Sequence, residues 1–174
     1  MKSRQILPLK RRRLGKTDYR QRYRLLASGK PRLVFRKKTK NIIMQIIKYN
    51  PKGDTVIVTS TTKELEKYGW NIARRNTPAA YLLGYLTGLK SKSKDITEVI
   101  YDVGLHRTTK GSIMFAALKG AIDAGLKIPH SPDLFPNQDR MTGKHLKNSP
   151  FEKTLADIKN KFVIKQNVKP QITE

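Results

Sequence analysis

The hydrophobic pattern is clearest between residues 32 and 60, where three short apolar runs are separated by polar breaks. RLVFRK, NIIMQIIKY and TVIVTS are rich in β-branched and aromatic residues, as strands are. The second break, NPKGD, contains a Pro and a Gly that suit a turn. The pattern predicts a meander of three antiparallel strands. Because the second and third runs are continuously apolar rather than alternating, we expect other elements to pack on the sheet and to leave no open face.

Two helices and a fourth strand are predicted after the meander. Thr77 and Pro78 suit the N-cap and first position of a helix, whose apolar residues then recur at helical spacing: Leu82, Tyr85, Leu86 and Leu89. EVIYDV is typical of a buried strand, and a second helix is expected from near Ser112 to Gly125. A strand, helix and strand in succession favour a crossover that places helices against the sheet. The order predicts a small α/β domain over residues 31–129.

The segments on either side of this domain have a different character. Residues 1–30 form a basic arm: positions 1–16 have no apolar period and are expected to be extended or disordered until bound, whereas 17–28 suit a short helix. Residues 130–174 form an extension that starts in a proline-rich irregular loop. Its final helix is predicted from a capping box at Ser149, Pro150 and Glu152. With an apolar face that includes Ile158 and Phe162, this helix either folds back on the domain or docks on a neighbour.

The charge of the chain indicates a polyanionic partner. Lys and Arg number 37 against 13 Asp and Glu, which gives a net charge of +24 in 174 residues. Sixteen of these cations lie within the first forty residues, with Asp18 as the one acid there. Such a charge repels itself and is tolerated best when a phosphate backbone neutralises it. We therefore expect a nucleic-acid-binding protein.

RNA is favoured over DNA by the way aromatic and cationic residues alternate in YRQRYR. Tyr19 and Tyr23 can stack on unpaired bases while neighbouring Arg side chains hold phosphates. Alternatively, these two rings, four residues apart, pack one face of a helix. GLHRTTKGS adds Lys110 and a helix start that can hold one phosphate.

Several functional classes receive no support. The chain has no Cys, and its three His residues lack metal-ligand spacing. It has no membrane-length apolar run and no signal-peptide core, so we expect a cytoplasmic protein. A metal-dependent nuclease needs clustered carboxylates, but Asp102 has no matching acid and is interpreted as a hydrogen-bonded structural residue. A non-specific RNA chaperone or DNA-compacting protein stays as an alternative, and no cofactor is expected.

Several long blocks carry a family resemblance: GKTDYRQRYRLLASGKPRLVFRK, ELEKYGW, NTPAAYLLGYLTG, YDVGLHRTTKGSIMFAALKGAIDAGLKIPHS and DRMTGKHL. In this order they resemble the archaeal-type large-subunit ribosomal protein L-eighteen family, roughly over residues 11–146. The resemblance implies a four-stranded α/β core with a mixed sheet. It also implies a structural, non-enzymatic protein of the central protuberance that binds 5S rRNA and helps to join it to 23S rRNA and neighbouring ribosomal proteins, with no membrane or small-molecule substrate.

The resemblance places the RNA-binding surface on the arm and on its continuation into the domain. The residues predicted to contact RNA there are Lys10, Arg11, Arg12, Arg13, Lys16, Thr17, Tyr19, Arg20, Arg22, Tyr23, Arg24, Lys30, Arg32, Arg36, Lys37, Lys38 and Lys40. The segment GLHRTTKGS adds His106, Arg107 and Lys110. No catalytic or metal-binding residue is predicted.

Overall fold

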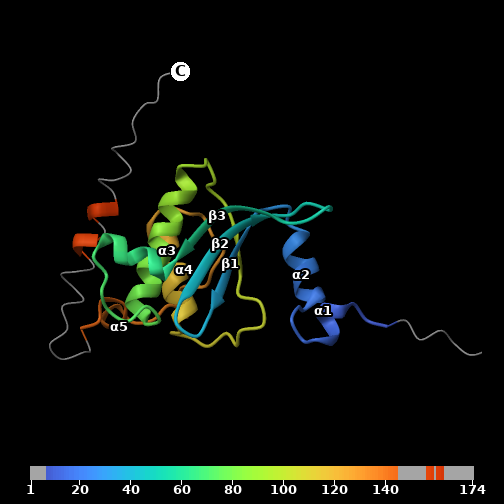
Figure 1. Ribbon diagram of the computed structural model, residues 1–174, viewed down its shortest axis with the longest axis horizontal. Coiled ribbons are helices and arrows are strands. Elements are labelled where there is room, and N and C mark those ends of the chain that lie inside the picture. Colours follow the sequence, from blue (N-terminus) through green and yellow to red (C-terminus); the bar gives the residue numbers. More distant parts are fainter. Residues whose placement is uncertain (1–6, 145–155, 159, 163–174) are drawn as a thin grey trace, which may run out of the picture.

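The structure, a computed structural model, describes residues 7–144, 156–158 and 160–162 (Figure 1). Its strands are β1 (Arg32–Lys37), β2 (Ile42–Lys48), β3 (Thr55–Thr61) and β4 (Ile100–Asp102), in the spatial order β3-β2-β1-β4. The first three are antiparallel neighbours, whereas β4 pairs in parallel with β1. The predicted α/β fold with a four-stranded mixed sheet is confirmed. β4 is shorter than the predicted run EVIYDV.

Two helices, α3 (Thr77–Lys92) and α4 (Ile113–Asp123), cover one face of the sheet (Figure 1). The apolar side chains Leu33, Phe35 and Met44 point into the core between them and the sheet. α3 begins where it was predicted, but its cap is Asn76, whose side chain accepts a hydrogen bond from the backbone N–H of Ala79 at 2.9 Å. An amide oxygen at the N-cap satisfies one of the helix's free N–H groups.

The opposite face of the sheet is partly open. Ile42, Met44 and Ile46 of β2 are buried, whereas the alternate positions Ile43, Gln45 and Ile47 are only half-buried. In β3, Val56 is 47% exposed. The expectation that no face would be open is therefore wrong for the second face of β2 and β3. Apolar residues at every position of a strand do not require two covering layers, because a sheet tolerates half-exposed aliphatic side chains.

α3 and α4 approach closely at two glycines. A Cβ at Gly84 would lie 1.9 Å from the carbonyl oxygen of Ala117, and one at Gly120 would lie 2.0 Å from that of Tyr81. Backbone oxygens cannot move aside as flexible side-chain ends can. We expect Gly84→Ala to lower the free energy of unfolding by about 1–3 kcal/mol through overpacking, measured by urea denaturation. The exposed helix-end variant Lys94→Ala serves as the control, and an equal stability of the two variants would contradict this packing.

The arm contains more structure than predicted. It holds a single helical turn, α1 (Lys10–Arg13), followed by α2 (Tyr19–Leu26). The expectation of an extended segment is thus wrong for residues 10–13. The turn is closed by backbone hydrogen bonds, among them Lys16 N–H to Arg11 C=O at 2.9 Å, and Arg11 Nε donates to Thr17 Oγ1 at 2.8 Å. Asp18 caps α2, since its carboxylate accepts from the N–H groups of Arg20 at 2.9 Å and Gln21 at 3.2 Å.

Further short helices lie outside the predicted helices and strands. They are η1 (Thr62–Tyr68), η2 (Pro132–Leu134) and α5 (Gln138–Thr142). The prediction of a purely irregular surface loop is wrong for residues 132–134, which form η2, and for 138–140, which begin α5. α5 buries Met141 in the core. A short amphipathic turn of this kind has too few residues to show a period.

The last predicted helix lies partly outside the described residues, including its capping box. Its described positions, 156–158 and 160–162, are helical, and Ile158 and Phe162 are 1% and 2% exposed. They pack into a second apolar cluster with Leu65 and Trp70, and the Phe162 ring lies edge-on to Tyr68 at 4.4 Å between centroids. Of the two alternatives for this helix, the described part follows the first: it folds back on its own domain.

Candidate nucleic-acid interface

The arm presents most of its cations to solvent. α1 consists of four consecutive basic residues, and neither α1 nor α2 contains a buried residue. In Figure 1 both helices stand beside the sheet on the side away from α3 and α4. Within the described ranges, Lys10, Arg12, Arg13, Lys16, Arg20 and Arg24 make no ion pair. Their charge is therefore available to an anionic partner.

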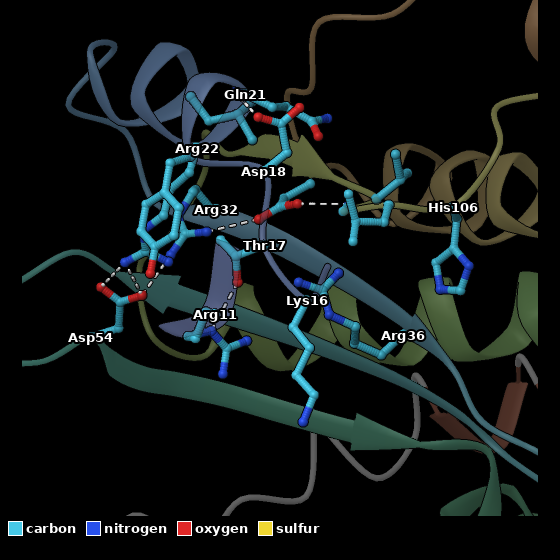
Figure 2. Close-up of a pocket in the computed structure, with 16 residues that line it drawn as sticks. Arg11, Lys16, Thr17, Asp18, Gln21, Arg22, Arg32, Arg36, Asp54 and His106 are labelled. Atoms are coloured by element: carbon cyan, nitrogen blue, oxygen red, sulfur yellow. Dashed lines mark hydrogen bonds and ion pairs between the residues drawn. The ribbon is translucent and has the colours of Figure 1, made fainter. Parts of the chain in front are cut away.

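Arg22 and Arg32 differ from the other arm cations, because carboxylates of the chain itself bind them (Figure 2). Arg32 is only 3% exposed. Its Nη1 lies 2.7 Å from Asp102 Oδ2, and its Nη2 lies 2.7 Å from Asp54 Oδ2. Arg22 Nη2 lies 2.8 and 3.0 Å from the two oxygens of Asp54. The burial of Arg32 does not fit the prediction that it contacts RNA, so we take it as a structural residue.

Asp102 was interpreted as a hydrogen-bonded structural residue, and this is confirmed. One carboxylate oxygen accepts from Arg32, and the other accepts from the N–H of Gly104 at 2.9 Å. The residue is 5% exposed. A carboxylate held in this way on a buried guanidinium is not placed to hold a divalent ion, and the described residues contain no cluster of three or more His or acidic side chains.

A cleft of about 610 Å³ separates the arm from the core. Arg11 and Lys16 line it from the arm, and Arg36 and His106 line it from β1 and from the segment after β4 (Figure 2). Arg36 Nη1 also donates to the Phe35 carbonyl at 2.7 Å, which holds this side chain in place. The cleft thus brings together three predicted segments that are far apart in the sequence. Five Lys or Arg side chains and three Asp side chains line it, so its charge is net positive.

A second hollow continues the basic surface at the end of β1. Lys37, His106 and Arg107 line it together with Arg140 of α5. Sequence reasoning did not select Arg140, although it stands in the block DRMTGKHL that carried part of the family resemblance. Its only available signal was its charge, because its position in the same hollow as Lys37 depends on how α5 packs.

Most of the remaining predicted residues lie outside these two hollows. Tyr19 lines the cleft, whereas Tyr23 is 75% exposed, so the packing alternative does not hold for the Tyr23 ring. Lys30 forms an exposed ion pair with Glu98 at 2.8 Å. Lys38, Lys40 and Lys110 are exposed. The structure therefore gathers the arm, the end of β1 and residues 104–110 on one basic surface.

Comparison with known proteins identifies the family. The sequence profile described as "Ribosomal large subunit proteins 60S L5, and 50S L18" matches residues 3–95 and 89–131. The chain belongs to this family. The chain is 54% identical to the "Large ribosomal subunit protein uL18" of Thermofilum pendens over 142 aligned residues. The aligned residues make up 82% of this chain and 72% of that protein.

Other archaeal relatives agree with this assignment. The uL18 protein of Methanococcus maripaludis is 51% identical, over 82% of this chain and 74% of its own length. That of Korarchaeum cryptofilum is 50% identical, over 79% and 70% respectively. A uL18 family member is a structural component of the large ribosomal subunit and not an enzyme, and it works with rRNA and other ribosomal proteins in the cytoplasm. No helix in the described ranges is long and apolar enough to span a membrane.

Proposed function

We propose that this chain binds 5S rRNA and helps to attach it to 23S rRNA and neighbouring proteins in the central protuberance of the large subunit. The observation that carries the proposal is the convergence of the arm, the end of β1 and residues 104–110 around one basic cleft. A folded RNA presents phosphates from several strands, and such a surface can contact several of them at once. The family membership supports the choice of a ribosomal RNA.

In this proposal the contacts divide into two kinds. The exposed arm cations hold phosphates, which supplies affinity without sequence preference. The exposed ring of Tyr23 stacks on an unpaired base. Arg36 and His106 contact the backbone where it passes the cleft, and Arg107 contacts it at the second hollow. The folded domain sets the position of both groups relative to each other. Arg140 joins the proposed surface, and Arg32 is left out of it.

The dependence of binding on salt tests this division. We expect Arg13→Ala to weaken binding to 5S rRNA and to reduce the slope of log affinity against log salt by about one, since one phosphate contact is lost. The measurement is a fluorescence anisotropy titration at several salt concentrations. Lys94→Ala, which removes an exposed charge from the turn after α3, should leave the slope unchanged. Equal slopes in the two variants would contradict a phosphate contact at Arg13.

The imidazole of His106 gives a separate test. Its partial burial and the charges of Arg36 and Lys37 lower its pKa below the ordinary histidine value, which favours the neutral ring in the free protein. A bound phosphate favours the imidazolium, so the complex takes up a proton that the free protein lacks. Affinity should therefore rise as the pH falls from about 7.5 to about 5.5. In His106→Gln this rise should be smaller than in the control His130→Gln; an equal rise would exclude His106 from the interface.

Two other functions predict different results. A non-specific RNA chaperone would bind unrelated RNAs with equal affinity. A metal-dependent nuclease would cleave RNA when magnesium is added and lose this activity in Asp102→Asn. The ion pair between Asp102 and Arg32 disfavours the nuclease, and we expect no cleavage by either protein.

A further inference from the structure

A continuous line of ion pairs connects the arm with the segment that follows β4. It consists of Arg22 in α2, Asp54 between β2 and β3, Arg32 in β1 and Asp102 in β4, and it ends at the N–H of Gly104. Figure 2 shows its outer part, where Arg22 and Arg32 converge on Asp54. We call these four side chains the ion-pair chain. It spans elements that lie up to 80 residues apart, from Arg22 to Asp102.

The two ends of the ion-pair chain are the two segments proposed to contact RNA. Arg22 stands between the exposed cations Arg20 and Arg24 on α2. Gly104 leads directly into His106, and its backbone lies against Arg36, since a Cβ there would be 2.9 Å from Arg36 Nη1. The ion-pair chain therefore fixes the distance between the arm cations and the cations on the far side of the cleft.

The ion pairs at the two ends of the ion-pair chain differ in their exposure to solvent. The side chains of Arg32 and Asp102 are 4% and 8% exposed, so their pair is shielded from solvent and rigid. Arg22 is 31% exposed, and its pair with Asp54 is the ion pair that joins α2 to the domain within the described ranges. α2 has no fully buried residue, and Tyr19, Gln21, Leu25 and Leu26 are only half-buried. Asp54 is thus the acid through which α2 is tied to the buried Arg32.

We propose that Asp54 is a positioning residue that sets which RNA the protein prefers, and this rests on the proposed binding of 5S rRNA. Asp54 is an acid and gains nothing from a phosphate. By binding Arg22 and Arg32 together, it holds the arm at one spacing from residues 104–107. An RNA whose phosphates match this spacing is bound by both groups at once, whereas other RNAs are bound by the arm alone.

For the replacement of Asp54, the proposal predicts a change in RNA affinity opposite to the change expected from net charge alone. Replacing an acid near a polyanion by a neutral residue strengthens binding if charge alone decides. Release of the arm instead weakens binding to the matching RNA. We expect Asp54→Asn to bind 5S rRNA about tenfold more weakly, as is typical of coupled neighbouring residues, and to bind transfer RNA with unchanged or slightly higher affinity.

The experiment compares four single variants and one double variant, with 5S rRNA and transfer RNA as probes. Asp54→Asn is matched by Asp133→Asn, an exposed acid on η2, and Arg22→Gln is matched by Arg24→Gln, which removes the same charge from the same helix. Asp54→Asn and Arg22→Gln should each reduce the preference for 5S rRNA more than their controls do. The double variant, Asp54→Asn with Arg22→Gln, should lose no more of the preference for 5S rRNA than whichever of its two single variants loses more. If Asp54→Asn fails to fold, the Arg22→Gln and Arg24→Gln pair decides.

A second readout needs no RNA. Trypsin should cleave the arm of the free Asp54→Asn protein faster than that of Asp133→Asn, because α2 is no longer held. Equal cleavage together with equal preference in Asp54→Asn and Asp133→Asn would overturn the proposal. If the wild-type chain itself shows no preference for 5S rRNA, the proposed function and the role of Asp54 in RNA preference both fail, and the trypsin comparison then shows whether Asp54 holds the arm at all.

Discussion

A chain that begins at Pro31 should fold and lose about a thousandfold or more of its affinity for 5S rRNA at low salt. Interfaces with six to ten phosphate contacts change in affinity by about 10³ to 10⁵ between about 50 and 200 mM salt, and the arm supplies cations of that number. Folding should persist because α1 and α2 bury no side chain in the core. The measurement is a binding titration of both chains, with thermal unfolding as the check on the fold.

The salt dependence of the two chains separates the arm from the domain. Affinity of the full chain should fall steeply as salt is raised, whereas the truncated chain should show a shallow slope. A full-length variant with Gln at Lys10, Arg11, Arg12 and Arg13 controls for chain length and should give an intermediate slope. Equal binding by the truncated and full-length chains at moderate salt would show that the arm is not a principal RNA contact.

The second large effect is a loss of stability when the buried ion pair between Arg32 and Asp102 is broken. Asp102→Ala leaves the guanidinium of Arg32 buried beside one remaining carboxylate, and loss of one partner of a buried pair costs about 3–5 kcal/mol. The free energy of unfolding, measured by urea denaturation, should fall by this amount. The double variant Arg32→Met with Asp102→Ala should recover a large part of it, because apolar groups then replace the pair.

A matched control for this prediction is Asp133→Ala, which removes an acid that is exposed on η2. It should change the free energy of unfolding by less than about 0.5 kcal/mol. If Asp102→Ala were as stable as Asp133→Ala, the pair with Arg32 would contribute nothing and the account of Arg32 as a buried structural cation would be wrong.

The sheet and the two long helices were predictable from the sequence because their signals are local. β-branched runs indicate β1 to β3, and helical spacing of Leu residues indicates α3. The strand-helix-strand order and the family resemblance both favoured a crossover to a fourth strand, but no local signal shows that β4 pairs with β1, because this pairing joins residues about seventy positions apart, such as Val34 and Asp102. The turn α1 was missed because four consecutive cations have no apolar period, although backbone hydrogen bonds close it.

The sequence predicts that the protein has a basic surface, but not which of its cations lie on that surface. A cation in a basic run has the same sequence signal whether it faces solvent or the core. Arg32 is buried in β1, where Asp54 from the β2–β3 connection and Asp102 from β4 bind it, whereas Arg13 is exposed on α1. The place of Arg140 in the same hollow as Lys37 likewise depends on the packing of α5. The charge thus indicates that the partner is a nucleic acid, and the fold determines which cationic side chains can contact it.

The central claim is that the protein prefers one folded RNA, and competition tests it most directly. Labelled 5S rRNA is bound to the full chain at moderate salt, and unlabelled transfer RNA or 5S rRNA is added in increasing excess. Both competitors carry the same phosphate backbone, so charge alone cannot distinguish them. We predict that 5S rRNA displaces the label near stoichiometric amounts and that transfer RNA displaces it only at large excess. Equal displacement by the two RNAs would contradict the account.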